Sequence, residues 1–207
     1  MTLRTAAVIT AALILSGCAS MEPAPTWKAA QTTDEFTDKT TSIVTTGDFT
    51  YTPSVFASPL HLYPVVRKEG GEIYVGVMSG GRFKMPVGTV QLRVDQNEAW
   101  TITPQETPVF MIPAAPSYTA PNLTPEQQAI IKSSQDQAML STSQLMSPYT
   151  ITGGDKAKQI IKQMASGRQI KYRTVGINQA SSTTGEAVID PSFARALKAI
   201  GVDPNTL

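Results

Sequence analysis

Hydrophobic and polar residues alternate along the middle of the chain, between residues 72 and 102. Each alternating run is short and ends at glycine or at a polar turn such as residues 96–98. A period of two sends successive side chains to opposite faces of a strand, so one face is buried and the other solvated. The alternating apolar positions are Ile73, Val75, Val77, Val90, Leu92, Val94, Trp100 and Ile102. We therefore predict a mainly β fold, an antiparallel β-sandwich-like domain whose strands begin at about residue 43.

The polar stretch at residues 124–145 has the features of an exposed helix. Thr124 precedes Pro125, and Gln127 follows three residues after the threonine. Threonine caps free backbone N–H groups, and proline suits the first helical position. The remainder is rich in Gln, Ser and Ala with few apolar positions, which predicts a lightly packed helix.

Helical spacing of apolar residues returns in the last third of the chain. A helix that starts at a cap on Asp155 and ends at Gly167 would place Ile160, Ile161 and Met164 on one face. A second helix begins at Asp190-Pro191, and it carries Phe193, Leu197 and Ile200 on one face. Between these two helices we predict two strands. The β domain is thus expected to carry two or three short helices in its C-terminal half.

The N-terminus has the three-part layout of a secretory signal peptide. Arg4 supplies a positive charge, an apolar run covers residues 6–15, and small residues follow. The run is too short for a transmembrane helix, which needs about 20 apolar residues. It closes on Leu15-Ser16-Gly17-Cys18.

These last four residues resemble the lipobox of bacterial lipoproteins. The resemblance implies that the thiol of Cys18 receives a diacylglycerol group and that cleavage before Cys18 makes it the first residue of the mature chain. The residue that follows is Ala19 rather than aspartate, which in the sorting rule of that class favours the outer membrane. We therefore expect a chain anchored by lipid in the bacterial cell envelope, at the outer membrane.

The pattern divides the chain into three parts. Residues 1–17 are the predicted signal peptide, residues 18–42 a predicted flexible tether, and residues 43–203 a single β-rich domain. The tether is rich in Pro, Thr and acidic residues and contains Trp27 as an isolated apolar residue. An alternative is that part of this segment lies along the domain and that Trp27 packs there.

Charge and cysteine content exclude several classes of function. The 17 basic residues include Arg4, so removal of the signal peptide leaves 16 basic against 16 acidic residues. This balance argues against a nucleic-acid-binding protein, which usually carries a strongly basic domain. Cys18 is the single cysteine, so disulfides, thiolate metal sites and cysteine catalysis are not expected. We predict no cofactor and no metal site.

The order of elements from residue 85 onward resembles a second family. Met85-Pro86-Val87-Gly88 opens a strand, and a closing helix carries Phe193 with Ala196 and Leu197. This order is similar to the invasion-associated locus B family of periplasmic β-sandwich proteins over residues 70–103 and 150–201. The resemblance implies a non-catalytic role in envelope stress or host contact. The chain departs from the family in lacking cysteine pairs and in having Ser192 where glycine would precede the phenylalanine.

Catalytic candidates are few. His61 is the single histidine, and Ser58 is the serine nearest to it in sequence, but the Gly-x-Ser-x-Gly turn of serine hydrolases is absent around it. Two carboxylate pairs, Asp95 with Glu98 and Glu69 with Glu72, are candidates for the acid–base chemistry of a glycosidase, yet both lie at predicted hairpin turns, where solvated acids are common. An envelope hydrolase that uses His61 or one of these pairs is the alternative function.

A basic segment supplies a candidate binding site. Between residues 150 and 185 six basic residues accompany one acid, Asp155. Such a patch suits lipid headgroups, lipopolysaccharide phosphates or anionic wall polymer. Its members are Lys156, Lys158, Lys162, Arg168, Lys171 and Arg173. The main prediction is therefore a lipid-anchored, non-catalytic envelope protein with a binding, structural or accessory role. Its partner would be an anionic envelope polymer or another envelope protein.

Overall fold

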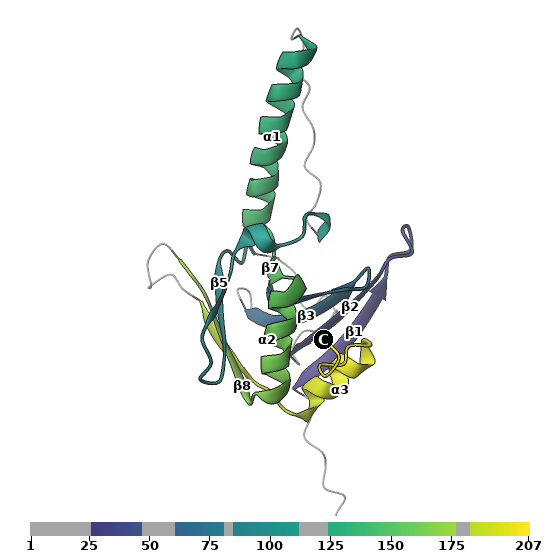
Figure 1. Ribbon diagram of the computed structural model, residues 1–207, viewed down its shortest axis with the longest axis vertical. Helices are drawn as coiled ribbons and strands as arrows, with labels where there is room; N and C mark the ends of the chain where they lie inside the picture. The colour runs from purple at the N-terminus through teal and green to yellow at the C-terminus, as the bar shows by residue number, and fades with distance from the viewer. Residues whose placement is uncertain (1–25, 47–60, 81–84, 112–123, 177–182) are drawn as a thin grey trace, which may run out of the picture.

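The computed structural model describes residues 26–46, 61–80, 85–111, 124–176 and 183–207. Within these ranges the chain forms two antiparallel sheets, two helices packed against them and one long helix that projects from one end (Figure 1). The prediction of a mainly β fold with helices in the C-terminal half is confirmed.

The larger sheet has five strands in the order β1-β2-β3-β4-β7, all antiparallel. The β3–β4 hairpin turns through Gly70 and Gly71, which both have positive φ and therefore suit a tight two-residue turn. The strands are β1 (Trp27–Thr33), β2 (Thr40–Thr46), β3 (Leu62–Glu69), β4 (Glu72–Ser79) and β7 (Tyr149–Thr152).

The smaller sheet has four strands in the order β6-β5-β8-β9, also antiparallel. Its inner face carries the alternating residues of β5, which are fully buried as the sequence pattern predicts. The strands are β5 (Val90–Val94), β6 (Trp100–Ile102), β8 (Gln169–Thr174) and β9 (Thr184–Val188).

The main core lies where both sheets meet α2 (Gly154–Ser166) and α3 (Pro191–Ala199). The apolar stripes predicted for these helices face this core: Ile160, Ile161 and Met164 of α2 are fully buried. Phe193 and Leu197 of α3 are buried in the same cluster. The stripes bury because apolar residues three and four apart share one face of a helix.

Helix α1 (Pro125–Leu145) stands apart from this core (Figure 1). The predicted capping box is present, since the Thr124 hydroxyl accepts a hydrogen bond from the Gln127 N–H. The predicted exposure is also found, because Ile130 remains 67% accessible. Two short 3-10 turns, η1 (Pro104–Glu106) and η2 (Val109–Met111), lie between β6 and α1 in sequence.

The chain joins the domain earlier than the pattern predicts. β1 and the first residues of β2 fall inside residues 18–42, the range assigned to a flexible tether. Trp27 is 2% exposed and belongs to the main core. The tether prediction is therefore corrected from residue 27 onward, in favour of the alternative in which Trp27 packs on the domain.

Two further expectations change. α2 begins at Gly154, with Gly153 as its cap, so Asp155 lies inside the first turn, where its charge suits the helix dipole.

Strand β4 is buried on both faces, because Val75 lies in the main core while Tyr74 and Met78 lie in a second cluster across the sheet. The prediction that each strand is half-buried is wrong for this one.

Candidate functional site

The outer face of the four-stranded sheet gathers polar and cationic side chains. In β5 the polar residues Gln91 and Arg93 alternate with buried valine and leucine. In β8 Lys171 and Arg173 are exposed, while Ile170 and Tyr172 are buried between the layers. The period of two therefore directs these four side chains to one outer surface. We call this surface, together with the facing side of β9, the open face.

The strand register brings the cations of the open face together. Arg93 lies directly opposite Lys171, and Gln91 lies opposite Arg173. Like charges directly opposite each other on a sheet are destabilising. On the next strand Glu186 lies opposite Lys171, so this central row holds two cations and one acid. The row therefore carries one net positive charge, which favours an anion at this surface.

The two guanidinium groups of the open face are oriented by hydrogen bonds. Nε and Nη2 of Arg173 both donate to Oε1 of Gln91, at 2.8 and 2.6 Å. Nε of Arg93 donates to the carbonyl oxygen of Asn97 at 2.8 Å. Each contact uses one edge of a guanidinium and leaves other N–H groups for a ligand. The Glu186 carboxylate accepts from the Gln169 amide at 3.2 Å.

The open face is also hollowed, with a cavity volume of about 560 Å³. Gly185 permits the close packing beneath it, because a Cβ at this position would overlap the ring of Tyr172. The hollow is broad and open to solvent rather than a deep cleft. Its lining consists of Gln91, Arg93, Ala99, Lys171, Tyr172, Arg173, Thr184, Gly185 and Glu186.

The six residues of the predicted basic patch do not form one surface. Lys171 and Arg173 lie in the hollow, whereas Lys158 lies on α2 with its ammonium 4.0 Å from the Asp155 carboxylate. Lys162 and Arg168 lie at the C-terminal end of α2 and just after it. Arg93 was not among the predicted site residues. The alternation in β5 indicates that it points outward, but the long-range pairing of β5 with β8 is absent from any local pattern.

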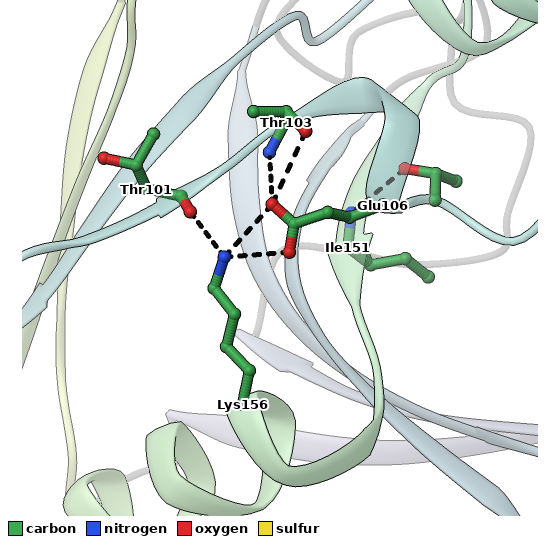
Figure 2. A network of polar contacts seen from close by, with 6 residues as sticks. Thr101, Thr103, Glu106, Ile151 and Lys156 are labelled. Carbon is green, nitrogen blue, oxygen red and sulfur yellow. Dashed lines mark hydrogen bonds and ion pairs between the residues drawn. The ribbon is translucent and has the colours of Figure 1, made fainter.

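Lys156, the remaining member of the predicted patch, forms an ion pair with Glu106 (Figure 2). Its ammonium donates to both carboxylate oxygens of Glu106, at 3.0 and 2.8 Å, and to the carbonyl oxygen of Thr101 at 2.6 Å. Glu106 also accepts from the Thr103 N–H at 2.9 Å. Burial works to raise the pKa of the Glu106 carboxyl, but these hydrogen bonds outweigh it and hold that pKa below its ordinary value. The network ties α2 to β6 and η1.

His61 lies one residue before β3 and is exposed. Its ring is tilted against that of Tyr63, with the centroids 5.2 Å apart. Ser58, the serine that the sequence placed beside it, lies outside the described residues. Among the described residues, the aromatic ring beside His61 is that of Tyr63.

One member of each candidate carboxylate pair makes structural contacts. Asp95 accepts hydrogen bonds from the backbone N–H groups of Arg168 and Gln169, at 3.0 and 2.9 Å, and so joins the β5–β6 turn to the start of β8. Glu69 lies opposite Glu72 at the end of the β3–β4 hairpin and accepts a hydrogen bond of 2.6 Å from Nη2 of Arg67. Both acids are explained by the local fold.

The lipidation candidate Cys18 and the predicted signal peptide lie outside the described residues. Within the ranges that the structure covers, no helix is long and apolar enough to cross a membrane. In those same ranges no cluster of three or more His, Cys, Asp or Glu side chains is placed to hold a metal ion.

No family model, curated protein or solved structure matches this chain.

Proposed function

We propose that this chain is a lipid-anchored protein of the bacterial cell envelope that binds an anionic envelope polymer, without catalysis, through the open face. The observation that carries the binding role is the direct opposition of Arg93 and Lys171 in the lining of a hollow that is open to solvent. The anchor rests on the lipobox-like sequence that ends at Cys18, and Ala19 after it favours the outer membrane. The resemblance to the invasion-associated locus B family agrees with a non-catalytic role.

The chemistry of the open face suits a glycan that carries phosphate or carboxylate groups. Arginine presents planar pairs of donors that match these anions, and its contacts with them are stronger than neutral hydrogen bonds. Gln91 and Thr184 add amide and hydroxyl groups that hydrogen-bond to sugar hydroxyls. A shallow, solvated surface suits a polymer that lies across the strands better than a small molecule enclosed on all sides.

The binding role is tested with the mature-length chain, residues 18–207 carrying Cys18→Ser, and immobilised lipopolysaccharide. We expect the double variant Lys171→Glu/Arg173→Glu to bind at least about tenfold more weakly, since a charge-assisted hydrogen bond contributes about 1.5–3 kcal/mol. Binding should also weaken with added salt.

The matched control is Lys158→Glu/Lys162→Glu on α2, which makes the same change in net charge on exposed side chains. It should retain the affinity of the parent chain. Equal losses in both double variants would show a general charge effect and contradict the assignment of the open face. Capture of an envelope protein that is insensitive to both variants would favour a protein partner instead.

The anchor is tested separately by the incorporation of radiolabelled palmitate in a bacterial host. The parent chain should take up label and co-purify with membranes, whereas Cys18→Ser should take up none. Label that persists in the variant would contradict the lipidation of Cys18.

A further inference from the structure

The first described strand is held firmly at the point where the chain enters the fold. The backbone N–H of Trp27 donates to the Ser192 hydroxyl at 2.8 Å, and its indole N–H donates to the carbonyl oxygen of Val188 at 2.8 Å. The indole also meets the Phe193 ring edge-on, with centroids 4.7 Å apart. Trp27 is thereby fixed between the end of β9 and the start of α3.

Asp190 extends this attachment by one residue toward the N-terminus. Its carboxylate accepts from the backbone N–H of Ser192 at 2.8 Å and also bonds to Thr26. The N-terminal chain therefore leaves the domain at a defined place beside the first turn of α3. It does not leave from a loosely attached segment.

This attachment limits the distance between the domain and the proposed lipid anchor. Eight residues, 18–25, precede Thr26, and at about 3.3–3.6 Å per residue they reach no further than about 29 Å. The predicted tether of residues 18–42 would have reached roughly three times as far. The end of the domain that carries Trp27 must stay close to the membrane surface.

The surface around this point carries exposed cations and one exposed apolar side chain. Arg168 is joined to it through its carbonyl oxygen, which accepts from the Ile189 N–H at 2.8 Å. Lys28 follows Trp27 directly, and Val188 is 58% exposed. Near this point Asp95 and Asp190 accept hydrogen bonds from backbone N–H groups of the fold, whereas Glu98, in the same turn as Asp95, is exposed.

We infer that this end of the molecule, with Arg168, Lys28 and Val188, lies against the headgroups of an anionic membrane. The inference rests on the lipid anchoring proposed above and adds to it a fixed orientation. Each basic side chain near an anionic surface strengthens attachment, and an exposed apolar side chain suits the interfacial region. Figure 1 shows α1 at the opposite end of the molecule from α3, so α1 is directed away from the membrane.

The orientation is measured on the lipidated protein bound to vesicles of phosphatidylethanolamine and phosphatidylglycerol. Because Cys18 is acylated, one introduced cysteine supplies the only free thiol for a fluorophore. Val188→Cys places the label near the proposed contact, and Lys132→Cys places it on α1. A quencher attached to the lipid headgroup should quench the label at 188 strongly and the label at 132 weakly.

Charge reversal then tests the contact itself. Lys28→Glu/Arg168→Glu should reduce the preferential quenching at 188. Each cation removed should lower the equilibrium constant for contact with the membrane by about fivefold. Added salt or neutral phosphatidylcholine vesicles should have the same effect. The control Lys39→Glu/Lys132→Glu, which reverses exposed cations in the β1–β2 turn and on α1, should leave the quenching at 188 unchanged.

Equal quenching at both label positions, or quenching at 188 that survives the reversal of Lys28 and Arg168, would overturn the inference. Flotation with the vesicles is measured first. A parent chain that takes up no palmitate and does not float contradicts the anchor, and the orientation is then rejected with it. A chain that floats but shows no preferred face contradicts the orientation alone.

Discussion

Single polar side chains join separate elements across the core. The Tyr172 hydroxyl donates to the carbonyl oxygen of Leu62 at 2.8 Å and so links the smaller sheet to the larger one. The Thr150 hydroxyl donates to the carbonyl oxygen of Gly88 at 2.6 Å. Within the described residues every buried side-chain nitrogen and oxygen atom has a partner. Because an unpaired buried polar atom costs about 1–3 kcal/mol, these contacts restrict how the two sheets can pair.

Tyr172 makes the stability of the protein sensitive to alkaline pH. Burial raises the pKa of its phenol from 10.0 to about 12. The folded state therefore retains a proton that the unfolded state loses, and the resulting stability is present below pH 10 and lost as pH rises through 12. A shift of this size corresponds to about 2–3 kcal/mol. Urea unfolding at pH 8 to 12, as a series, should show the decline.

Tyr172→Phe is the control for that measurement. It should cost about 1 kcal/mol at neutral pH, because the Leu62 carbonyl loses its partner, and it should remove most of the alkaline decline. An unchanged decline in the variant would assign the effect to other groups.

Among the elements, α2 and α3 could be predicted from sequence because their apolar stripes are continuous and their ends carry Gly or Asp-Pro. β1 could not. Trp27 is its only buried residue, and the remaining positions are mostly exposed alanine, glutamine and threonine, so no alternation marks it as a strand. Its place is determined by pairing with β2 and by the packing of one large side chain on α3.

The contribution of β1 is measurable by comparing two aromatic residues of the predicted tether. Trp27→Ala should cost about 3–5 kcal/mol in the free energy of unfolding, the range found for large buried aromatics. Phe36→Ala is the matched control, because Phe36 is 98% exposed in the β1–β2 turn, and it should change stability by less than about 0.5 kcal/mol. Chemical denaturation of both variants measures the difference. Equal small effects would mean that this segment is a tether after all.

At the scale of the whole molecule, stability is unevenly distributed. α2 packs its apolar face into the core between both sheets, whereas the first ten residues of α1 are exposed on all sides. α1 is attached near its C-terminal end, where the Gln144 amide donates to the carbonyl oxygens of Gln105 and Thr107, each at 3.2 Å. An exposed helical segment of this length is marginally stable without packing.

Native-state hydrogen exchange should separate the two helices. Amides of residues 128–134 should exchange through local opening, with free energies far below that of global unfolding. Amides of residues 160–164 in α2 should exchange only when the whole domain unfolds. Strong protection in α1 would show that another surface covers it in solution.

The sequence by itself determined the local features: the strands of the central meander, the stripes of α2 and α3, and the cap at Thr124. These depend on residue spacing within a few turns or strand lengths, and spacing is visible in a linear chain. The alternation of Lys171 and Arg173 with Ile170 and Tyr172 is a spacing of the same kind.

Only the tertiary structure decided which of these features meet. Arg93 faces Lys171, 78 positions later in the sequence, because β5 pairs with β8. Lys156 does not join the other basic residues, because it pairs with Glu106. Trp27 became a core residue through contacts with residues more than 160 positions away. Contacts of this range depend on how faces of different elements bury one another, which no local pattern contains.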